Sequence, residues 1–310
     1  MDWIQFLSGI PNRDYIVQDL PYDEQISRAE DLIEQGDAVL IGAGAGLSAA
    51  AGLTYGGPRF TENFSEFIKR YGPAAMRDMY SAGFYPFPTE EERWGYWSRH
   101  AYLNRIEPDA LPVYQKLFCM VQNREHFVLT TNVDHQFWKA GFRDRDIFAT
   151  QGDYGRIQCA VGCHPETYDA TGLFTDMDRA RKDCRIPSEM VPRCPVCGGP
   201  MAMNLRCDGH FVEDEHWHQA AEHYRAFLER MSGRRLVLLE LGVGFNTPAI
   251  IRFPFEKMAG GNRKWSLIRL NLDEAAVPES LGMRAVGINL DLSLSVEDLS
   301  EKLNQCESSN

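Results

Sequence analysis

Apolar residues follow a helical period near the start of the chain and then form a continuous run. Within 23–35 they fall three and four positions apart, and Gly36 is placed to end the predicted helix. The segment Ala-Val-Leu-Ile at 38–41 is apolar throughout, which is typical of a buried parallel strand. It leads directly into Gly-Ala-Gly-Ala-Gly-Leu-Ser at 42–48. The pattern predicts a strand, a glycine turn and a helix.

Three later apolar runs, 127–130, 236–241 and 266–270, predict further strands of the same kind. The residues that follow them are small or polar, namely Asn132 and Asp134, Gly242 and Gly244, and Asn271. Ligands of doubly wound α/β sheets bind at the carboxyl ends of the strands. We therefore predict an α/β fold in which a Rossmann-like parallel sheet presents a ligand site at that edge.

Two segments interrupt this pattern. Residues 56–112 are aromatic, contain proline and are weakly periodic, which predicts a helical insertion, whereas 153–209 are rich in cysteine and predict a small separate module. The remaining segments, assigned to the large domain, are 23–55, 113–152 and 210–300.

Composition and charge narrow the class of protein. The chain has 310 residues, of which 44% are hydrophobic, and it contains no apolar run long enough to cross a bilayer. The first residues lack the basic and apolar regions of a secretory signal, so we expect a cytoplasmic protein with no membrane partner. The net charge of −12 repels phosphate backbones, which argues against a nucleic-acid partner.

One segment departs from the acidic average, with the basic residues Arg179, Arg181, Lys182, Arg185 and Arg193. One hypothesis is a landing patch for an acidic partner. The alternative is an ordinary solvated face, in which these cations alternate with Asp176, Asp178 and Asp183. The sequence leaves both open.

The cysteine-rich module contains two close pairs, Cys159 with Cys163 and Cys194 with Cys197. Four thiolates at such spacings can close a tetrahedral Zn²⁺ site without an open position, which predicts one structural zinc per chain. Three residues separate the first pair, a less usual spacing than two, so His164 or Cys184 stays open as a substitute ligand. The competing interpretation is four unrelated buried cysteines.

The glycine turn at 42–46 is a weak signal by itself. Glycines let a backbone approach a pyrophosphate and direct amide N–H groups toward it, but a sharp turn also needs them. The ordinary dehydrogenase pattern is missing, because no acidic residue ends a second strand about 20 residues further on.

Taken together and in this order, these motifs resemble the sirtuin family over about 30–300, with 1–310 forming one sirtuin-type catalytic region. The family pattern GAGxSxxxGI has its counterpart within 42–53, and TQNID within 130–134. Gln151 and Gly152 stand where sirtuins have a His-Gly pair, eight residues before the first zinc cysteine. The later GTS motif corresponds to 242–244, followed by a ribose-contacting asparagine at 271.

The resemblance implies that NAD is a co-substrate. The residues implied to contact it are Gly42, Ala43, Gly44, Ser48, Gly52, Phe60, Thr131, Asn132, Asp134, Gln151, Gly242, Gly244 and Asn271. The usual Asp-Phe-Arg run after the glycine turn is altered, leaving Arg59 and Phe60 in reversed order.

The departures from the family bear on the reaction. Sirtuin deacylases use the histidine as a general base on the ribose hydroxyls, and the amide of Gln151 cannot take up that proton. Residues 203–209 replace a hydrophobic strand that pairs with the acyl-lysine peptide, and they place a cation at Arg206. We therefore expect efficient deacylation to be lost.

These changes resemble the class M, macrodomain-linked sirtuins, which are protein ADP-ribosyltransferases. That resemblance implies a lipoylated carrier protein, similar to the glycine-cleavage H protein, as the acceptor, and a macrodomain hydrolase that reverses the modification. The catalytic residues are then expected to be Asn132, Asp134, Gln151 and Arg206. Asp and Glu carboxylates are already ionised near neutral pH, so they suit a site without a base.

Several alternatives stay open. Asn132 and Asp134 are also common turn-capping residues, and the competing interpretations are an ordinary loop residue for Gln151 and a surface arginine on a mobile loop for Arg206. A second hypothesis for the reaction is a deacylase whose base is another residue, such as His135. A third hypothesis is a sensor that binds NAD or ADP-ribose without turnover.

Overall fold

The computed structural model describes residues 14–245 and 248–307. The chain folds as two compact units. The first unit comprises the chain up to Leu47, Lys116–Thr130 and the chain from Tyr224. The second unit comprises Ser48–Gln115 and Thr131–His223. None of the helices described is long and apolar enough to cross a membrane.

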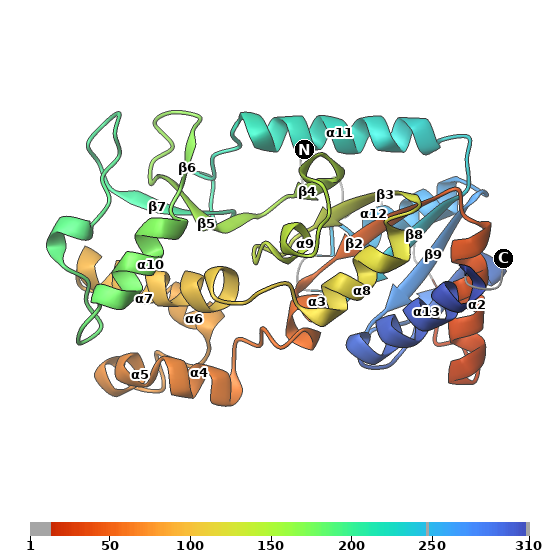
Figure 1. The fold of residues 1–310 in the computed structure, drawn as a ribbon, viewed down its shortest axis with the longest axis horizontal. Helices are drawn as coiled ribbons and strands as arrows, with labels where there is room; N and C mark the ends of the chain where they lie inside the picture. The colour runs from red at the N-terminus through yellow and green to blue at the C-terminus, as the bar shows by residue number, and fades with distance from the viewer. Residues whose placement is uncertain (1–13, 246–247, 308–310) are drawn as a thin grey trace. The chain divides into compact units, whose positions relative to one another are not determined.

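The first unit is built on a parallel sheet. Its strands follow the spatial order β11-β9-β8-β2-β3, of which β2, β3, β8 and β9 are labelled in Figure 1. They are β2 (Ala38–Ala43), β3 (Glu125–Thr130), β8 (Leu236–Leu241), β9 (Trp265–Leu270) and β11 (Ala285–Ile288). Almost all of their residues are buried, because helices cover both faces of the sheet. The strands predicted from the apolar runs are confirmed, each within three residues of its predicted bounds.

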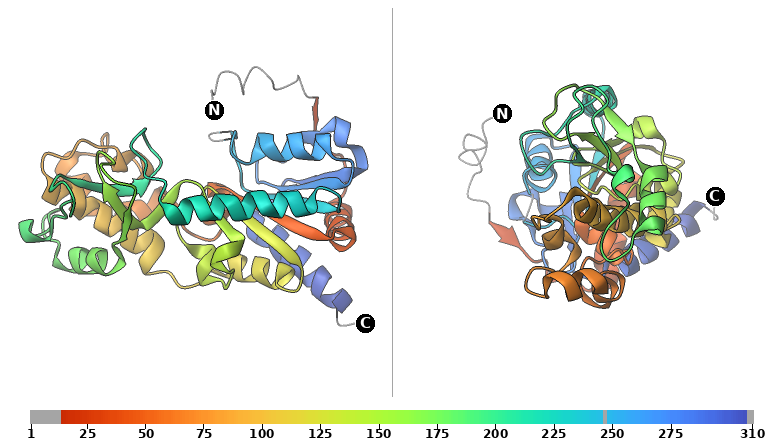
Figure 2. Two further views of the ribbon diagram at one scale, coloured as in Figure 1. Left: turned by 90° about the horizontal axis from the view of Figure 1, so that it is seen from above. Right: turned by 90° about the vertical axis from the view of Figure 1, so that its left-hand side faces the viewer.

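Helices lie on both faces of this sheet. Figures 1 and 2 show α12 on one face and α2 with α13 on the other. Their bounds are α2 (Tyr22–Gln35), α12 (Arg252–Gly261), α13 (Leu292–Glu307) and the 3₁₀ helix η4 (Glu279–Arg284). The predicted end of α2 is confirmed, since the Gly36 N–H donates to the carbonyls of Ile33 and Leu32. A short antiparallel pair, β1 (Tyr15–Ile16) with β10 (Val277–Pro278), was not predicted.

Three helices run from one unit into the other along the chain: α3 (Ala45–Ala50), α8 (Pro112–Val121) and α11 (Glu215–Met231). The helices of the second unit are α4 (Gly57–Asn63), α5 (Ser65–Tyr71), α6 (Met79–Gly83), α7 (Glu90–Ala101), the π-helix η1 (Tyr102–Ile106), α9 (Gln136–Lys139), η2 (Asp144–Asp146), α10 (Thr171–Ala180) and η3 (Ser188–Met190). Its strands are β4 (Ile147–Ala149), β5 (Gly152–Cys159), β6 (Thr167–Asp169) and β7 (Met201–Leu205). The last three form an antiparallel sheet in the order β6-β5-β7.

The helical segment and the cysteine-rich segment share one core in the second unit. Trp94 of α7 stacks on Phe174 of α10 with ring centroids 5.9 Å apart, and both side chains are completely buried. A side chain at Gly95 would meet the carbonyl oxygen of Cys184 at 2.3 Å, so the two segments touch backbone to backbone. We predicted the helical insertion and the cysteine-rich module as separate parts of the chain. A core shared by two distant segments leaves no periodic signal in either segment.

Candidate active site and structural zinc centre

In the first unit, the glycine turn after β2 packs directly on the loop after β8. Gly44 donates its N–H to Leu241 O at 2.9 Å, and Gly46 donates to Gly242 O at 3.0 Å. A Cβ on Gly44 would lie 2.7 Å from Gly242 O, and one on Gly46 would lie 2.7 Å from Gly242 Cα. These glycines are therefore required by the close approach of two strand-end loops, which shapes the predicted ligand edge of the sheet.

The start of the predicted glycine motif has a different role. Gly42 and Ala43 lie within β2 and are buried, and a Cβ on Gly42 would meet the side chains of Ile251 and Phe255 at 2.5 Å. Gly42 thus makes room for α12 against the sheet. Gly42 and Ala43 were both expected to contact NAD. In the structure Gly42 packs against α12, and Ala43 is buried in the core.

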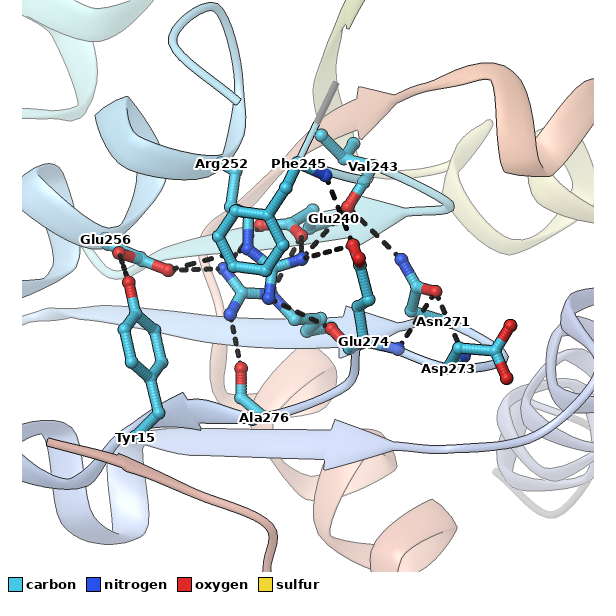
Figure 3. A network of polar contacts seen from close by, with 11 residues as sticks. Tyr15, Glu240, Val243, Phe245, Arg252, Glu256, Asn271, Asp273, Glu274 and Ala276 are labelled. Atoms are coloured by element: carbon cyan, nitrogen blue, oxygen red, sulfur yellow. Dashed lines mark hydrogen bonds and ion pairs between the residues drawn. The ribbon is translucent and has the colours of Figure 1, made fainter. Parts of the chain in front are cut away.

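The loops that follow β8 and β9 are joined by side chains (Figure 3). Asn271 donates from its amide to Val243 O at 3.2 Å, and its amide oxygen accepts from the N–H groups of Asp273 and Glu274 at 3.3 Å. Arg252 donates to the carbonyls of Val243 and Glu274, both at 3.0 Å. The predicted residues Gly242, Gly244 and Asn271 therefore belong to one braced edge of the first unit.

Beneath these loops lies a buried ion cluster (Figure 3). Arg269 of β9 donates to both carboxylate oxygens of Glu240 on β8, at 2.8 and 2.9 Å, and to Glu256 of α12 at 2.8 Å. All three side chains are at most 1% exposed. Tyr15 donates its hydroxyl to Glu256 at 2.9 Å. Charged groups this deeply buried persist only when they are paired and hydrogen-bonded.

In the second unit, Asp134 is the centre of a buried hydrogen-bond cluster. Its Oδ2 accepts from the Ser48 hydroxyl at 2.5 Å and from the Tyr114 hydroxyl at 3.3 Å, and the Asn132 amide donates to Tyr114 at 3.4 Å. Burial raises the pKa of Asp134, and the hydrogen bond from Ser48 opposes that shift. The structure brings the predicted residues Ser48, Asn132 and Asp134 together. It adds Tyr114, which carries no motif signal.

The capping alternative for Asp134 also has support. Its Oδ1 accepts from the backbone N–H of Gln136 at 3.0 Å, as in an Asx turn. The two oxygens of this carboxylate thus have separate roles, one in the turn and one in the cluster with Ser48.

His135 is held in place by its neighbours. Its Nδ1 lies 2.6 Å from Asp153 Oδ2, and its ring stacks on Trp138 with centroids 4.5 Å apart. Its backbone is left-handed, with φ of 65°. Asp153 is also paired with Arg105 at 2.9 Å. Burial alone raises the pKa of Asp153, but the hydrogen bond from His135 and the charge of Arg105 outweigh burial and bring it to about 2.

Gln151 lies in a turn in which only glycine fits at the next position, residue 152. Gly152 has φ of 97°, and a Cβ there would lie 1.9 Å from Asn204 O. Gln151 O accepts from the backbone N–H of Arg206 at 3.0 Å, and Arg206 Nε donates to Thr150 O at 3.1 Å. The predicted residues Gln151 and Arg206 are therefore brought together.

The guanidinium of Arg206 has further contacts. It lies over the ring of Phe211 at 4.2 Å and over that of Trp217 at 5.3 Å. Its Nη2 pairs with Glu213 at 2.6 Å. Such contacts fix the cation in one position, which disfavours the interpretation of Arg206 as a mobile surface arginine.

Three other predicted residues are placed as follows. Phe60 is 1% exposed and stacks on Phe64 at 5.2 Å, so its ring lies in the aromatic core of the second unit. Gly52 has φ of 97° with open space around it. Thr131 is half-buried.

The four predicted zinc ligands converge. The Sγ atoms of Cys159, Cys163, Cys194 and Cys197 all lie within 4.8 Å of one another. Hydrogen bonds from backbone N–H groups, first that of Cys163, lower the pKa of the Cys159 thiol to about 6. Four converging sulfurs of which one readily ionises suit Zn²⁺, which binds thiolates.

Neither Cys184 nor His164 is needed in place of a cysteine ligand, because the four cysteines already converge. Cys184 is buried in the aromatic cluster of Phe60 and Phe64, apart from the four sulfurs. His164 approaches Cys163 Sγ with its Nδ1 at 3.0 Å, while its Nε2 bonds to the Tyr168 hydroxyl at 2.7 Å. The imidazole is thereby oriented beside the four-cysteine set.

The basic segment around Arg181 is largely neutralised. Arg181 pairs with Glu66 and Asp178, Arg185 with Glu92, and Arg179 with Asp176. This favours a solvated, charge-paired face over a landing patch for an acidic partner.

Comparison with known proteins agrees with this geometry, although no protein-family model matches the chain. A protein ADP-ribosyltransferase of Staphylococcus aureus (strain Mu50) is 36% identical over 275 residues, covering 87% of this chain and 86% of that protein. A probable bifunctional ADP-ribose hydrolase/ADP-ribosyltransferase of Fusarium oxysporum f. sp. cubense is 33% identical over 266 residues, covering 82% of this chain and 43% of that protein.

Among solved structures, a complex of a Sir2 homologue with NAD matches with a TM-score of 0.60 at 16% identity. The match covers 90% of this chain and 94% of that chain, so the likeness extends to the fold as a whole. With a relative of 36% identity along most of both sequences, the chain belongs to the protein ADP-ribosyltransferases that have the fold of Sir2 homologues.

Proposed function

We propose that this protein cleaves NAD and transfers the ADP-ribosyl group to an Asp or Glu side chain of a lipoylated carrier protein, with release of nicotinamide. The observation that carries the proposal is the hydrogen-bonded turn of Gln151 and Arg206. It combines a residue that cannot act as a base with a cation that can bind a carboxylate. The ADP-ribosyltransferase relatives support the reaction type.

The reaction needs no proton transfer. The bond between C1′ of the ribose and the nicotinamide nitrogen breaks, and its electron pair neutralises the nicotinamide ring. A carboxylate oxygen then forms an ester with C1′, so the charges balance without a base. Because positive charge builds on the ribose, the site has to orient the ring and stabilise that charge.

The second unit contains side chains suited to these tasks. We assign Asn132 to a hydrogen bond with the ribose or an ordered water, and Asp134 to the nicotinamide carboxamide. Gln151 can donate to and accept from the ribose hydroxyls without changing its charge. The cluster of Ser48 and Tyr114 holds Asp134 in one orientation, which favours catalysis by positioning.

We further propose that a macrodomain hydrolase removes the modification. The relative from Fusarium oxysporum carries both activities in its name, and this chain covers 43% of that protein. Such a fusion supports a hydrolase as a functional partner of the transferase.

The test is incubation of the protein with labelled NAD and a lipoylated carrier protein. Label is expected on the carrier, and neutral hydroxylamine should release it, because that reagent cleaves carboxylate esters of ADP-ribose. Asn132→Ala serves as the inactive control. Absence of transfer to any carrier, together with robust lysine deacylation, would overturn the proposal.

One observation favours a second candidate, a sirtuin-type lysine deacylase. Asp153 holds the His135 imidazole at 2.6 Å, an arrangement that can orient a histidine base. Release of O-acyl-ADP-ribose from an acylated peptide, lost in His135→Ala, would support it. Tight NAD binding without any nicotinamide release would instead indicate a sensor.

A further inference from the structure

We propose that Glu213 occupies the place of the acceptor carboxylate on Arg206 until the target protein displaces it. This inference rests on the proposed function, because it takes the acceptor to be an Asp or Glu side chain. It adds a residue of this chain that competes with the substrate at the same cation. Glu213 thereby sets how tightly an acceptor must bind.

Arg206 is fixed before any acceptor arrives. Its main chain is bound to Gln151 O and its Nε to Thr150 O, and its guanidinium lies over the rings of Phe211 and Trp217. An arginine fixed in this way loses little further entropy when it binds a carboxylate. The cation is thus a preorganised anion site beside the Gln151 turn.

Glu213 fills this anion site with the group that the proposed substrate would bring. Its Oε1 lies 2.6 Å from Arg206 Nη2, and the two side chains are 34% and 36% exposed. Ion pairs with this exposure contribute little net stability, so a second carboxylate can replace Glu213 at small cost. The displaced carboxylate would return to solvent, leaving no buried charge without a partner.

The neighbouring carboxylate is committed elsewhere. Asp214 accepts from the backbone N–H of Trp217 at 2.9 Å, at the start of α11, and from the Thr167 hydroxyl. An acid at 214 is therefore explained by capping, whereas the carboxylate of Glu213 is directed to Arg206. The contrast between two adjacent acids supports a separate role for Glu213.

The backbone that presents Glu213 is held by buried amides. Gln158 donates to His210 O at 2.7 Å and accepts from Val212 N–H at 2.9 Å, and Asn204 donates to Val212 O at 3.1 Å. The segment 209–213 also lines a cleft with residues 161–165 next to the zinc ligand Cys163. Glu213 thus stands on an ordered segment at a cleft, where an incoming acceptor chain can reach it.

The experiment compares Glu213→Gln and Glu213→Ala with the wild type, using the lipoylated carrier and NAD as separately varied substrates. Removing the Glu213 carboxylate should lower the KM for the carrier about threefold to fivefold. The KM for NAD should stay the same, so the ratio of the carrier KM to the NAD KM should fall. Glu215→Gln is the matched control. It removes the same charge two residues away, where the side chain bonds to Gln219 at 3.0 Å.

An unchanged or raised carrier KM in both Glu213 variants, with normal transfer by the wild type, would overturn the inference. Absence of transfer by the wild type would instead contradict the proposed function. A binding measurement then still decides about Glu213. N-acetyl-glutamate amide, followed by titration calorimetry, should bind several-fold more tightly to Glu213→Ala than to the wild type and fail to bind Arg206→Ala. Equal binding to all three proteins would rule out the carboxylate site.

Discussion

Arg206 donates its backbone N–H to the carbonyl oxygen of Gln151 at 3.0 Å. The two residues by which this chain departs most clearly from sirtuin deacylases are therefore parts of one turn. Both are placed by the pairing of β5 with β7, in which Gly152 lies opposite Leu205. The residue proposed to act at the ribose and the residue proposed to bind the acceptor carboxylate are thus built on the same local structure.

This link makes Gln151→His an informative substitution. The hydrogen bond to Arg206 uses the main chain of residue 151, so the cation stays in place when the side chain changes. We expect the variant to show no lysine deacylation and to lose transfer to the carrier by roughly tenfold or more, because the amide contacts to the ribose are lost. The measurements are O-acyl-ADP-ribose release and label transfer. Deacylation by the single variant would show instead that the missing base alone prevents it.

Asp153 predicts a pH-dependent contribution to stability. Its pKa is about 2 in the folded protein and about 3.9 in an unfolded chain, so folding favours its ionised form. The resulting stabilisation, roughly 2–3 kcal/mol, is present above pH 4 and is lost as the pH falls from about 4 toward 2. Asp153→Asn should therefore lower the free energy of unfolding by about this amount at pH 7, and the difference from wild type should shrink below pH 4.

Urea unfolding at pH 7, 5 and 3.5 measures this difference. Asp176→Asn is the control, because its carboxylate is 66% exposed and its pair with Arg179 is at the surface. An equal loss of stability at all three pH values would show that Asp153 acts through packing and not through its charge.

The sequence predicted the parallel strands and the zinc ligands for clear physical reasons. A strand covered on both faces is apolar at every position, as in 38–41, and a thiolate site needs close cysteine pairs. The hydrogen bond from Tyr114 to Asp134 could not be predicted from the sequence. This tyrosine lies on α8, and only the fold brings it to Asp134, so neither periodicity nor spacing identifies it.

Phe60 and Gly42 show a second limit of prediction from sequence. Both were expected to contact NAD, and the structure places Phe60 in an aromatic core and Gly42 beneath α12. A sequence pattern reports which residue stands at a position and not which way its side chain points. Likewise, Glu213 is one of many acids until the fold places it on Arg206.

The zinc centre predicts that Cys194→Ser loses the metal. Removing one of four thiolates leaves an incomplete tetrahedral site, and binding of structural zinc contributes directly to folding. We expect one zinc per chain in the wild type, less than one tenth of that in the variant, and faster proteolysis within 153–209. Metal analysis and limited proteolysis measure both. Cys207→Ser, an exposed cysteine outside the cluster, should keep its zinc.

The contact between the two glycine loops predicts the effect of Gly46→Ala. The added Cβ would lie 2.7 Å from Gly242 Cα, and a backbone atom cannot turn aside as a side chain can. We expect a loss of about 1–3 kcal/mol in unfolding free energy and weaker NAD binding, because the strand-end loops must separate. Calorimetric binding of NAD and thermal unfolding test this.

Gly260→Ala is the matched control for that substitution. Gly260 lies in α12, and a Cβ there would meet nothing within 4 Å. Alanine is favoured over glycine in a helix by about 0.5–1 kcal/mol, so this variant should be slightly stabilised. Equal destabilisation by both substitutions would show that the loop contact at Gly46 is not the cause.

The buried ion cluster predicts an asymmetry between breaking it and replacing it (Figure 3). Arg269→Met leaves two buried carboxylates, Glu240 and Glu256, with Arg252 as their one remaining buried cation, at 3.7 and 4.0 Å. Because a buried charge that loses its partner is costly, we expect a loss of about 3–5 kcal/mol. The double variant Arg269→Met, Glu256→Gln removes one cation and one carboxylate together, leaves Glu240 with Arg252 as its partner, and should recover at least half of that loss.

Chemical unfolding of the single and double variants measures the recovery. Arg252 lies 3.7 Å from Glu240 and also holds Val243 O, so it retains a role at the strand-end loops in both variants. NAD binding should therefore fall less than stability does in the single variant. If the double variant is as unstable as the single one, the cluster stabilises the sheet through its hydrogen-bond geometry, and charge compensation alone does not explain it.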